Sequence, residues 1–180
     1  MNIELAIGLA FALQAQIPSA LPGVASKEDL LVIDGHKDPS RIPQWAAWEM
    51  GFNTVDGWIG RDSGFTHDLR EALTADELSL LEREAVAQAT RRAEAIRDTE
   101  SLRPLLASMD KDAAAAAKLQ DRIHAVDLKC RRDTHDARDR VLQGLSPASQ
   151  AVLQAWVDDI RSTMICEVPR SELAHWRSPE

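Results

Sequence analysis

The sequence contains no tyrosine and only three phenylalanines, so aromatic residues make up just 4% of its 180 residues. It also has no excess of positive charge, because 21 Lys and Arg stand against 29 Asp and Glu, for a net charge of −8. An acidic total argues against nucleic-acid binding. Hydrophobic residues at 44% and charged residues at 28% are close to the averages for soluble globular proteins, so neither a disordered chain nor a polytopic membrane protein fits.

Short signatures of catalysis are also missing. The chain has no G-x-S-x-G, P-loop, G-x-G-x-x-G, H-E-x-x-H or paired C-x-x-C motif, so we expect no enzymatic activity and no cofactor. The best catalytic candidates are Asp34, His36 and Asp38, where a carboxylate could orient an imidazole for general-base work. A solvated turn explains the same three residues and is the preferred interpretation.

The N-terminal residues have features of an export signal. Residues 5–13 form a short apolar run, prolines follow at 18 and 22, and Gly23-Val24-Ala25 supplies small residues at a possible cleavage site. We therefore expect residues 1–25 to be a signal peptide, the mature chain to be periplasmic or secreted, and no membrane insertion after cleavage. The alternative is an amphipathic first helix, because Glu4 and no Lys or Arg precede the run.

Residues 26–72 are predicted to form an N-terminal loop followed by a short Trp-rich helix. The stretch from Asp34 to Pro43 is rich in Gly, Pro, Asp and Ser, which is typical of turns. One apolar stripe at helical spacing follows, made of Ile42, Trp45, Trp48, Phe52 and Val55. Such a stripe is far more often core than a ligand site, and residues 57–65 are expected to be a connection.

Residues 73–166 are predicted to form a helical hairpin core. Thr74 and Glu77 form a capping box at the start of one long helix, and the segment 101–110 with Pro104 predicts a break. The next helix begins after Asp110 and carries a seam of apolar residues at heptad spacing, with Thr134 as its one polar member: Leu119, Ile123, Val126, Cys130, Ala137 and Val141. Gly144 ends this helix and Ser146-Pro147 begins another. The sequence therefore predicts an all-α protein of about four helices, with a long antiparallel hairpin folded about Gly144 and a tail over 167–180.

The two cysteines form an even count, which an oxidising compartment would allow to pair. Cys130 and Cys166 are a disulfide candidate if the chain after Ile165 folds back from the helix. The alternative is two buried free thiols.

The two predicted helix starts resemble a known family. Leu73-Thr74-Ala75-Asp76-Glu77 and Leu145-Ser146-Pro147-Ala148-Ser149 are similar to the paired motifs of the LTxxQ-type periplasmic proteins, which include Spy-like and CpxP-like chaperones and stress adaptors. Here Glu and Ser stand where the family has Gln. The stretch from Ile33 to Trp48 also resembles the start of uncharacterised secreted bacterial helical proteins. The first resemblance implies an exported helical protein, a possible homodimer, that holds a protein client or partner, with structural roles for Leu73, Thr74, Leu145 and Ser146.

A periplasmic metal-binding or sensor domain is the alternative function. His67 and Glu71 stand four residues apart and would share one helix face, but two ligands do not make a site. His124 and His135 are about 16 Å apart along a helix and cannot bind one ion together. No metal site is therefore predicted. The basic residues from Lys129 to Arg140 alternate with aspartates, which favours a solvated, salt-bridged face over an acidic partner's docking site.

Overall fold

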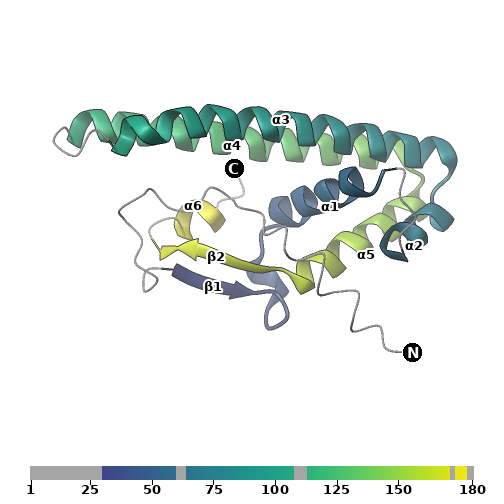
Figure 1. Ribbon diagram of the computed structural model, residues 1–180. Helices are drawn as coiled ribbons and strands as arrows, with labels where there is room; N and C mark the ends of the chain where they lie inside the picture. The colour runs from purple at the N-terminus through teal and green to yellow at the C-terminus, as the bar shows by residue number, and fades with distance from the viewer. Residues whose placement is uncertain (1–29, 60–63, 108–112, 171–172, 178–180) are drawn as a thin grey trace.

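The computed structural model describes residues 30–59, 64–107, 113–170 and 173–177 (Figure 1). The protein is predominantly α-helical, which confirms the predicted fold class. The described elements, in chain order, are β1 (Leu30–Asp34), the 3-10 helix η3 (Pro39–Arg41), α1 (Gln44–Trp58), α2 (Gly64–Ala72), α3 (Ala75–Ala107), α4 (Ala113–Gly144), α5 (Pro147–Thr163), β2 (Ile165–Pro169) and α6 (Leu173–Arg177).

The long antiparallel hairpin consists of α3, with 33 residues, and α4, with 32 residues. Across their interface the Gln88 amide donates a 2.7 Å hydrogen bond to Thr134, so the one polar residue of the predicted seam is satisfied by a buried partner. The prediction that the hairpin folds about Gly144 is wrong. α4 packs along the preceding helix, whereas α5 turns away and packs against α1.

Most of the helix ends lie at the capping residues that the sequence predicted. Ser146 caps α5 and accepts a hydrogen bond from the Ser149 amide, Pro147 is the first residue of that helix, and α4 ends at Gly144 as expected. α3 continues through Pro104 and ends at Ala107, inside the segment 101–110 where the break was predicted. The expected cap at Asp110 lies outside the described residues.

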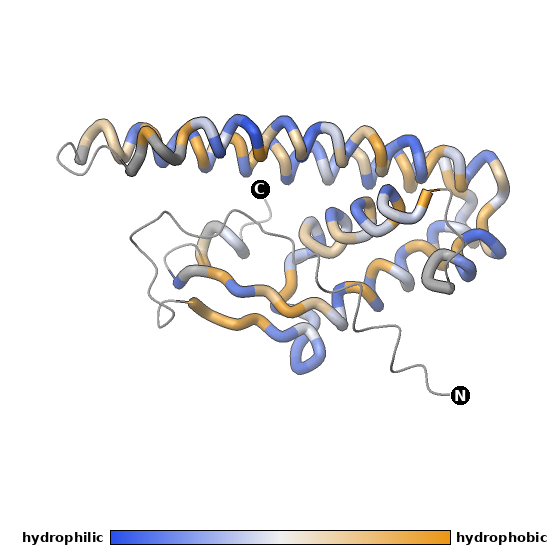
Figure 2. The backbone as a smooth tube through the Cα atoms, in the orientation of Figure 1, coloured by the Kyte–Doolittle hydropathy of each residue, from blue (hydrophilic) through white to orange (hydrophobic). Residues whose placement is uncertain are grey.

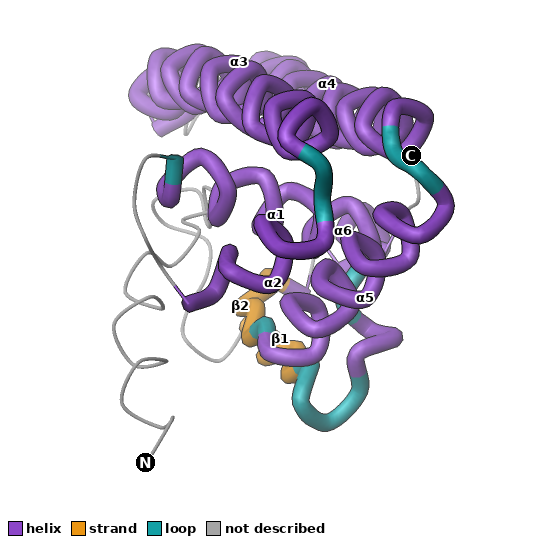
Figure 3. The backbone as a smooth tube through the Cα atoms, turned by 90° about the vertical axis from the view of Figure 1, so that its right-hand side faces the viewer, coloured by secondary structure: helices purple, strands orange, loops and turns teal. Residues whose placement is uncertain are grey.

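The core lies between the hairpin and α5, with α1 in the middle (Figures 1 and 3). The five residues of the predicted Trp-rich stripe are all buried, as expected for core. They share one hydrophobic cluster with residues of α3, α4, α5, both strands and Trp176 of α6. The segments predicted as an N-terminal region, a hairpin core and a tail therefore contribute to the same core. The predicted signal peptide lies outside the described residues.

A two-stranded antiparallel sheet was not predicted. β1 pairs with β2 so that Ile33 lies opposite Cys166 and Val32 opposite Glu167. Ile33 and Val168 face the core, while Val32 and Ile165 are exposed. Neither strand sequence, LLVID or ICEVP, alternates strictly between apolar and polar residues, so the strand pattern could not be recognised. In the described part of the chain, none of the helices combines the length and the apolar character that crossing a bilayer requires.

A close backbone contact joins the turn after β1 to the end of α5. The Gly35 amide donates a 2.8 Å hydrogen bond to the Met164 carbonyl, and a Cβ at Gly35 would lie 2.4 Å from the Arg161 carbonyl oxygen. We predict that Gly35→Ala lowers the free energy of unfolding by about 1–3 kcal/mol, because backbone atoms on both sides must move. Urea denaturation monitored by circular dichroism measures this change.

Gly57→Ala in α1 is the matched control, because no atom lies within 4 Å of the Cβ it would add. This variant should raise the free energy of unfolding by about 0.5–1 kcal/mol, since alanine has less backbone freedom to lose. If Gly35→Ala and Gly57→Ala changed the free energy of unfolding equally, the close backbone contact at Gly35 would be contradicted.

Candidate functional site

The two motif starts meet at the side chain of Glu77. Its carboxylate accepts hydrogen bonds from the amide and the hydroxyl of Thr74, both 2.9 Å, which closes the predicted capping box. It also accepts from the Ser146 amide at 2.8 Å and from the Ser149 hydroxyl at 3.0 Å. One side chain therefore ties the first turn of α3 to the first turn of α5, across 69 residues of sequence to Ser146.

These hydrogen bonds change the acidity of Glu77. The amide of Ser146 and then that of Thr74 lower the pKa of Glu77 from 4.5 to about 2, although its burial opposes the shift. The carboxylate is 8% exposed and is ionised at neutral pH. Thr74 and Ser146 thus hold the starts of α3 and α5 at Glu77, and Leu73 and Leu145 beside them are buried in the core.

A second cluster of charges lies where α1 meets the hairpin. Arg92 of α3 contacts the Glu49 carboxylate of α1 at 2.8 Å, with side chains 19% and 18% exposed. Burial raises the pKa of Glu49, while the charge of Arg92 opposes that shift. On α4, Arg131 contacts Asp127 at 2.6 Å. Sequence reasoning missed this cluster, although Glu49 follows Trp45 by one helical turn and was therefore a charged residue on the apolar stripe.

Aromatic rings cover this charge cluster. The Arg131 guanidinium lies over the ring of Trp45, 4.3 Å from its centroid, in a cation–π contact. On α6, Trp176 packs edge-on against Trp45, with ring centroids 5.0 Å apart. The last described helix is thereby attached to the first residues of α1. The cluster has the geometry of a structural joint, in which charges of both signs are paired.

The catalytic candidates of the sequence are found in an exposed turn. Nδ1 of His36 lies 3.1 Å from Asp34 Oδ1, so the imidazole and one carboxylate do meet. The other carboxylate, Asp38, instead accepts hydrogen bonds from the Ser40 amide and hydroxyl and caps η3. The His36 side chain is 59% exposed, and Asp34 also contacts Lys37. This arrangement is that of the predicted solvated turn.

Among the described side chains, His67, His124 and His135 form no cluster with further ligands. On α2, Nε2 of His67 lies 3.1 Å from Glu71, and both side chains are largely exposed, so the predicted pair is a surface ion pair. His124 and His135 lie on α4 and are both half-buried. Among the described residues, no group of three or more His, Cys, Asp or Glu side chains is placed to hold a metal ion.

The candidate disulfide is not formed in this structure. Cys130 and Cys166 are both free thiols, one half-buried on α4 and the other buried on β2 opposite Ile33. Burial raises the pKa of each thiol to about 11; for Cys130 the nearby charge of Glu49 adds to this effect. Both sulfurs are therefore in the unreactive thiol form at neutral pH.

The predicted salt-bridged face of α4 is present in part. Arg138 pairs with Asp139, and Arg140 contacts Glu84 of α3 at 2.8 Å. Arg131 differs from the prediction, because it is only 5% exposed and packs on Trp45 instead of facing solvent. The contact of Arg131 with the Trp45 ring could not be inferred from the charge pattern of α4 alone.

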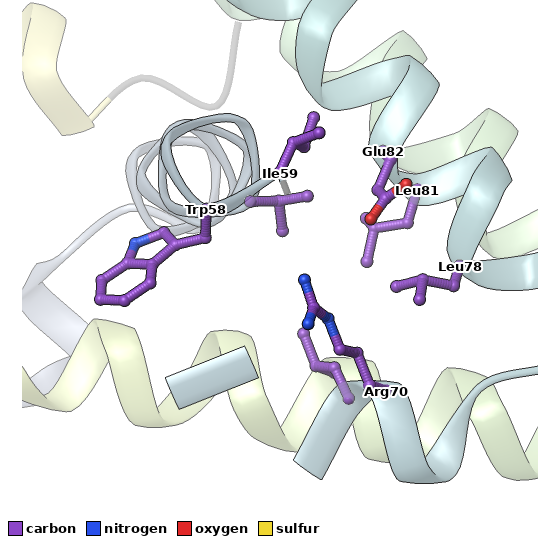
Figure 4. Close-up of a pocket in the computed structure, with 8 residues that line it drawn as sticks. Trp58, Ile59, Arg70, Leu78, Leu81 and Glu82 are labelled. Carbon is purple, nitrogen blue, oxygen red and sulfur yellow. The ribbon is translucent and has the colours of Figure 1, made fainter. Parts of the chain in front are cut away.

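A small pocket lies between the end of α1, α2 and the start of α3 (Figure 4). It is lined by apolar side chains together with Arg70 and Glu82. Its volume is ≈ 10 Å³, about enough for one water molecule and far below the roughly 300–1,000 Å³ of ligand pockets. A small organic molecule does not fit in this pocket.

Comparisons with known proteins found no match to a family model, a curated protein or a solved structure.

The Glu77 link predicts a specific pH dependence. A lowered pKa stabilises the folded protein fully above about pH 4.5, and this contribution is lost as the pH falls towards 2. In Glu77→Gln we expect lower stability at pH 7, because one carboxylate oxygen is replaced by an NH₂ group facing hydrogen-bond donors. The difference from the unsubstituted protein should shrink between pH 4.5 and pH 2. Urea denaturation at each pH measures it, and a difference independent of pH would contradict the role of Glu77.

The pairing of Glu49 with Arg92 predicts coupling between their substitutions. Glu49→Met alone should lower the free energy of unfolding by roughly 3 kcal/mol, because it leaves a largely buried guanidinium without its carboxylate. Glu49→Met combined with Arg92→Met should cost less than the sum of the single changes. A double-mutant cycle in urea measures the coupling. Additive effects would show that the two charges do not interact.

Proposed function

We propose that this protein is an exported, non-catalytic helical binding protein that holds a protein client or partner on the outer part of its hairpin. We call this part the arm and define it as residues 96–107 of α3 and 113–126 of α4. At 1.5 Å per residue, the arm projects roughly 15 Å beyond the contacts of α1. Figure 1 shows that the outer part of the hairpin extends past α6.

One observation supports the arm as the binding surface. Where α1 covers the hairpin, the apolar residues of its interface are fully buried, with Ala85, Ala137 and Val141 all at 0% exposure. Along the arm, Ile123 and Val126 are only half-buried, whereas Leu102 and Leu119 are buried. In the arm, α3 and α4 pack against each other without α1. Some apolar side chains of their seam therefore remain accessible on these two helices. Figure 2 shows that hydrophobic residues continue along both helices into the arm.

The position of α1 indicates what the arm would hold. Arg92 reaches Glu49 of α1, and Ile96 lies one turn further along the same side of α3. A client segment bound along the arm would lie on the same side of the hairpin as α1 and in line with it. The fitting ligand is therefore an amphipathic segment with large apolar side chains, like the stripe of α1 that contains Trp45, Trp48 and Phe52. Unfolded polypeptides expose such segments, which agrees with the chaperone-like role that the family resemblance implies.

Suppression of client aggregation tests this function. At equimolar ratio, the purified protein should reduce light scattering by a model client diluted from urea. The double variant Ile96→Ser, Ile123→Ser should lose at least half of this effect, because polar side chains weaken apolar contacts.

Val86→Ser is the matched control, because Val86 is 45% exposed on α3 outside the arm. It should suppress aggregation as well as the unsubstituted protein. Circular dichroism establishes that each variant remains helical. If the unsubstituted protein does not suppress aggregation, or if the control loses as much activity as the double variant, the proposal is wrong.

A further inference from the structure

The C-terminal helix α6 is short and docks through Leu173 and Trp176. Leu173 packs against the core cluster, and Trp176 is buried within it. The Trp176 ring lies edge-on against Trp45 of α1, and the Arg131 guanidinium of α4 lies over the same Trp45 ring. A helix of five residues is not stable by itself in water. The structure of α6 therefore depends on how tightly Trp176 is held.

The docking of Trp176 buries hydrogen-bond donors that find no acceptor. Nε1 of Trp176 and Nε1 of Trp45 are both buried, and neither donates a hydrogen bond to a described residue. An indole N–H that leaves water without an acceptor loses a hydrogen bond, which offsets part of the gain from burying the ring. When α6 leaves, the N–H of Trp176 can bond to water again. We therefore expect α6 to open while the rest of the core stays folded.

α6 docks where the cover of α1 over the hairpin ends and the arm begins. Figures 1 and 3 show α6 beneath the hairpin, on the side that α1 occupies. Glu49 of α1 contacts Arg92 of α3, and these two helices run in opposite directions (Figure 1). One turn from this ion pair towards the arm therefore leads to Trp45 on α1 and to Ile96 on α3. Trp176, which contacts Trp45, thus lies at the level where the arm starts.

We propose that α6 is an autoinhibitory latch, which covers Trp45 at the base of the arm and is displaced when a client segment binds there. This inference rests on the proposed function of the arm. With α6 docked, a client contacts the arm alone. With α6 open, it also contacts the part of Trp45 that Trp176 covered, so it binds the open form more tightly. The affinity for the client then falls with the fraction of molecules in which α6 is docked.

Hydrogen exchange of the indole N–H groups tests the latch without a client. Trp48 is the internal reference, because its Nε1 is also buried without an acceptor among the described residues, while its ring packs on Phe52 within α1. In NMR spectra of the full chain, the Trp176 indole should exchange at least about tenfold faster than that of Trp48. Low urea concentrations should accelerate exchange at Trp48 and leave Trp176 unchanged. Equal rates with equal urea dependence would overturn the proposal, because α6 would then leave only when the whole protein unfolds.

The variant Trp176→Ser tests whether α6 competes with the client. It removes the ring contact with Trp45 and so leaves the latch open. In the aggregation assay, half-maximal suppression should need at least about threefold less of this variant than of the unsubstituted protein. Gly35→Ala is the matched control, because it also disturbs the fold, at the contact with the end of α5, and keeps Trp176 in place. It should need the same amount as the unsubstituted protein, and circular dichroism establishes that both variants remain helical.

The outcomes separate the latch from the binding function of the arm. If the unsubstituted protein suppresses aggregation and Trp176→Ser does no better, the latch is wrong and the proposed function stands. An equal improvement in Gly35→Ala would also overturn the latch, because general loosening of the fold would then explain the effect. If neither the unsubstituted protein nor Trp176→Ser suppresses aggregation, the binding function fails and the autoinhibitory role fails with it.

Discussion

The carboxylate of Glu77 joins the start of α3 to the start of α5, and the arrangement of the long helices depends on this link. α4 begins at the far end of the hairpin and must return to the level of Glu77 before α5 can begin. Its length of 32 residues closely matches the 33 of α3, so the return is made by antiparallel packing along α3. Ser146 then meets Glu77 directly, and α5 leaves in a direction that places α1 between it and the hairpin. The Glu77 link thus holds the end of the antiparallel hairpin and the start of α5 together, on either side of the core.

Two carboxylates in this protein show how the surroundings of a charge decide its acidity. Glu77 accepts hydrogen bonds from two backbone amides and two hydroxyls, and these hold its pKa far below the ordinary value. Glu49 contacts Arg92 at the interface of α1 with the hairpin, and burial raises the pKa of Glu49. The first carboxylate fixes helix ends, where unpaired amides are available. The second holds α1 on the hairpin together with Arg92, beside the Arg131 and Trp45 contact.

Local chemistry was predictable from the sequence where the interacting residues are neighbours in the chain. The capping box of Thr74 and Glu77, the start of α5 at Pro147 and the buried stripe of α1 all depend on spacings of three or four residues. Helix pairing was predicted wrongly, because an apolar seam on α4 does not specify which neighbouring helix packs against it. The hydrogen bond from Ser146 to Glu77, which joins the starts of α3 and α5, connects residues 69 positions apart. The strands, the Arg131 and Trp45 contact and the docking of Trp176 were missed for the same reason, since each needs partners distant in sequence.

The hairpin has two different environments along its length. Over α1 it is one layer of the core, where the buried side chains of Gln88 and Thr134 are paired with each other. Beyond α1, the same seam has no third layer among the described elements, and two of its apolar side chains, Ile123 and Val126, are half-buried while Leu102 and Leu119 are buried. The half-buried apolar side chains of the arm are the basis of the client binding that we propose.

The central claim is that Glu77 is an ionised carboxylate that receives hydrogen bonds from both helix starts. An NMR titration that follows the side-chain carboxyl carbon of Glu77 together with the Ser146 amide tests this claim most directly. Our account predicts that both signals stay constant from neutral pH down through pH 4 and change together with a midpoint at about 2. A carboxyl carbon that titrates near 4.5 while the Ser146 amide does not respond would contradict it.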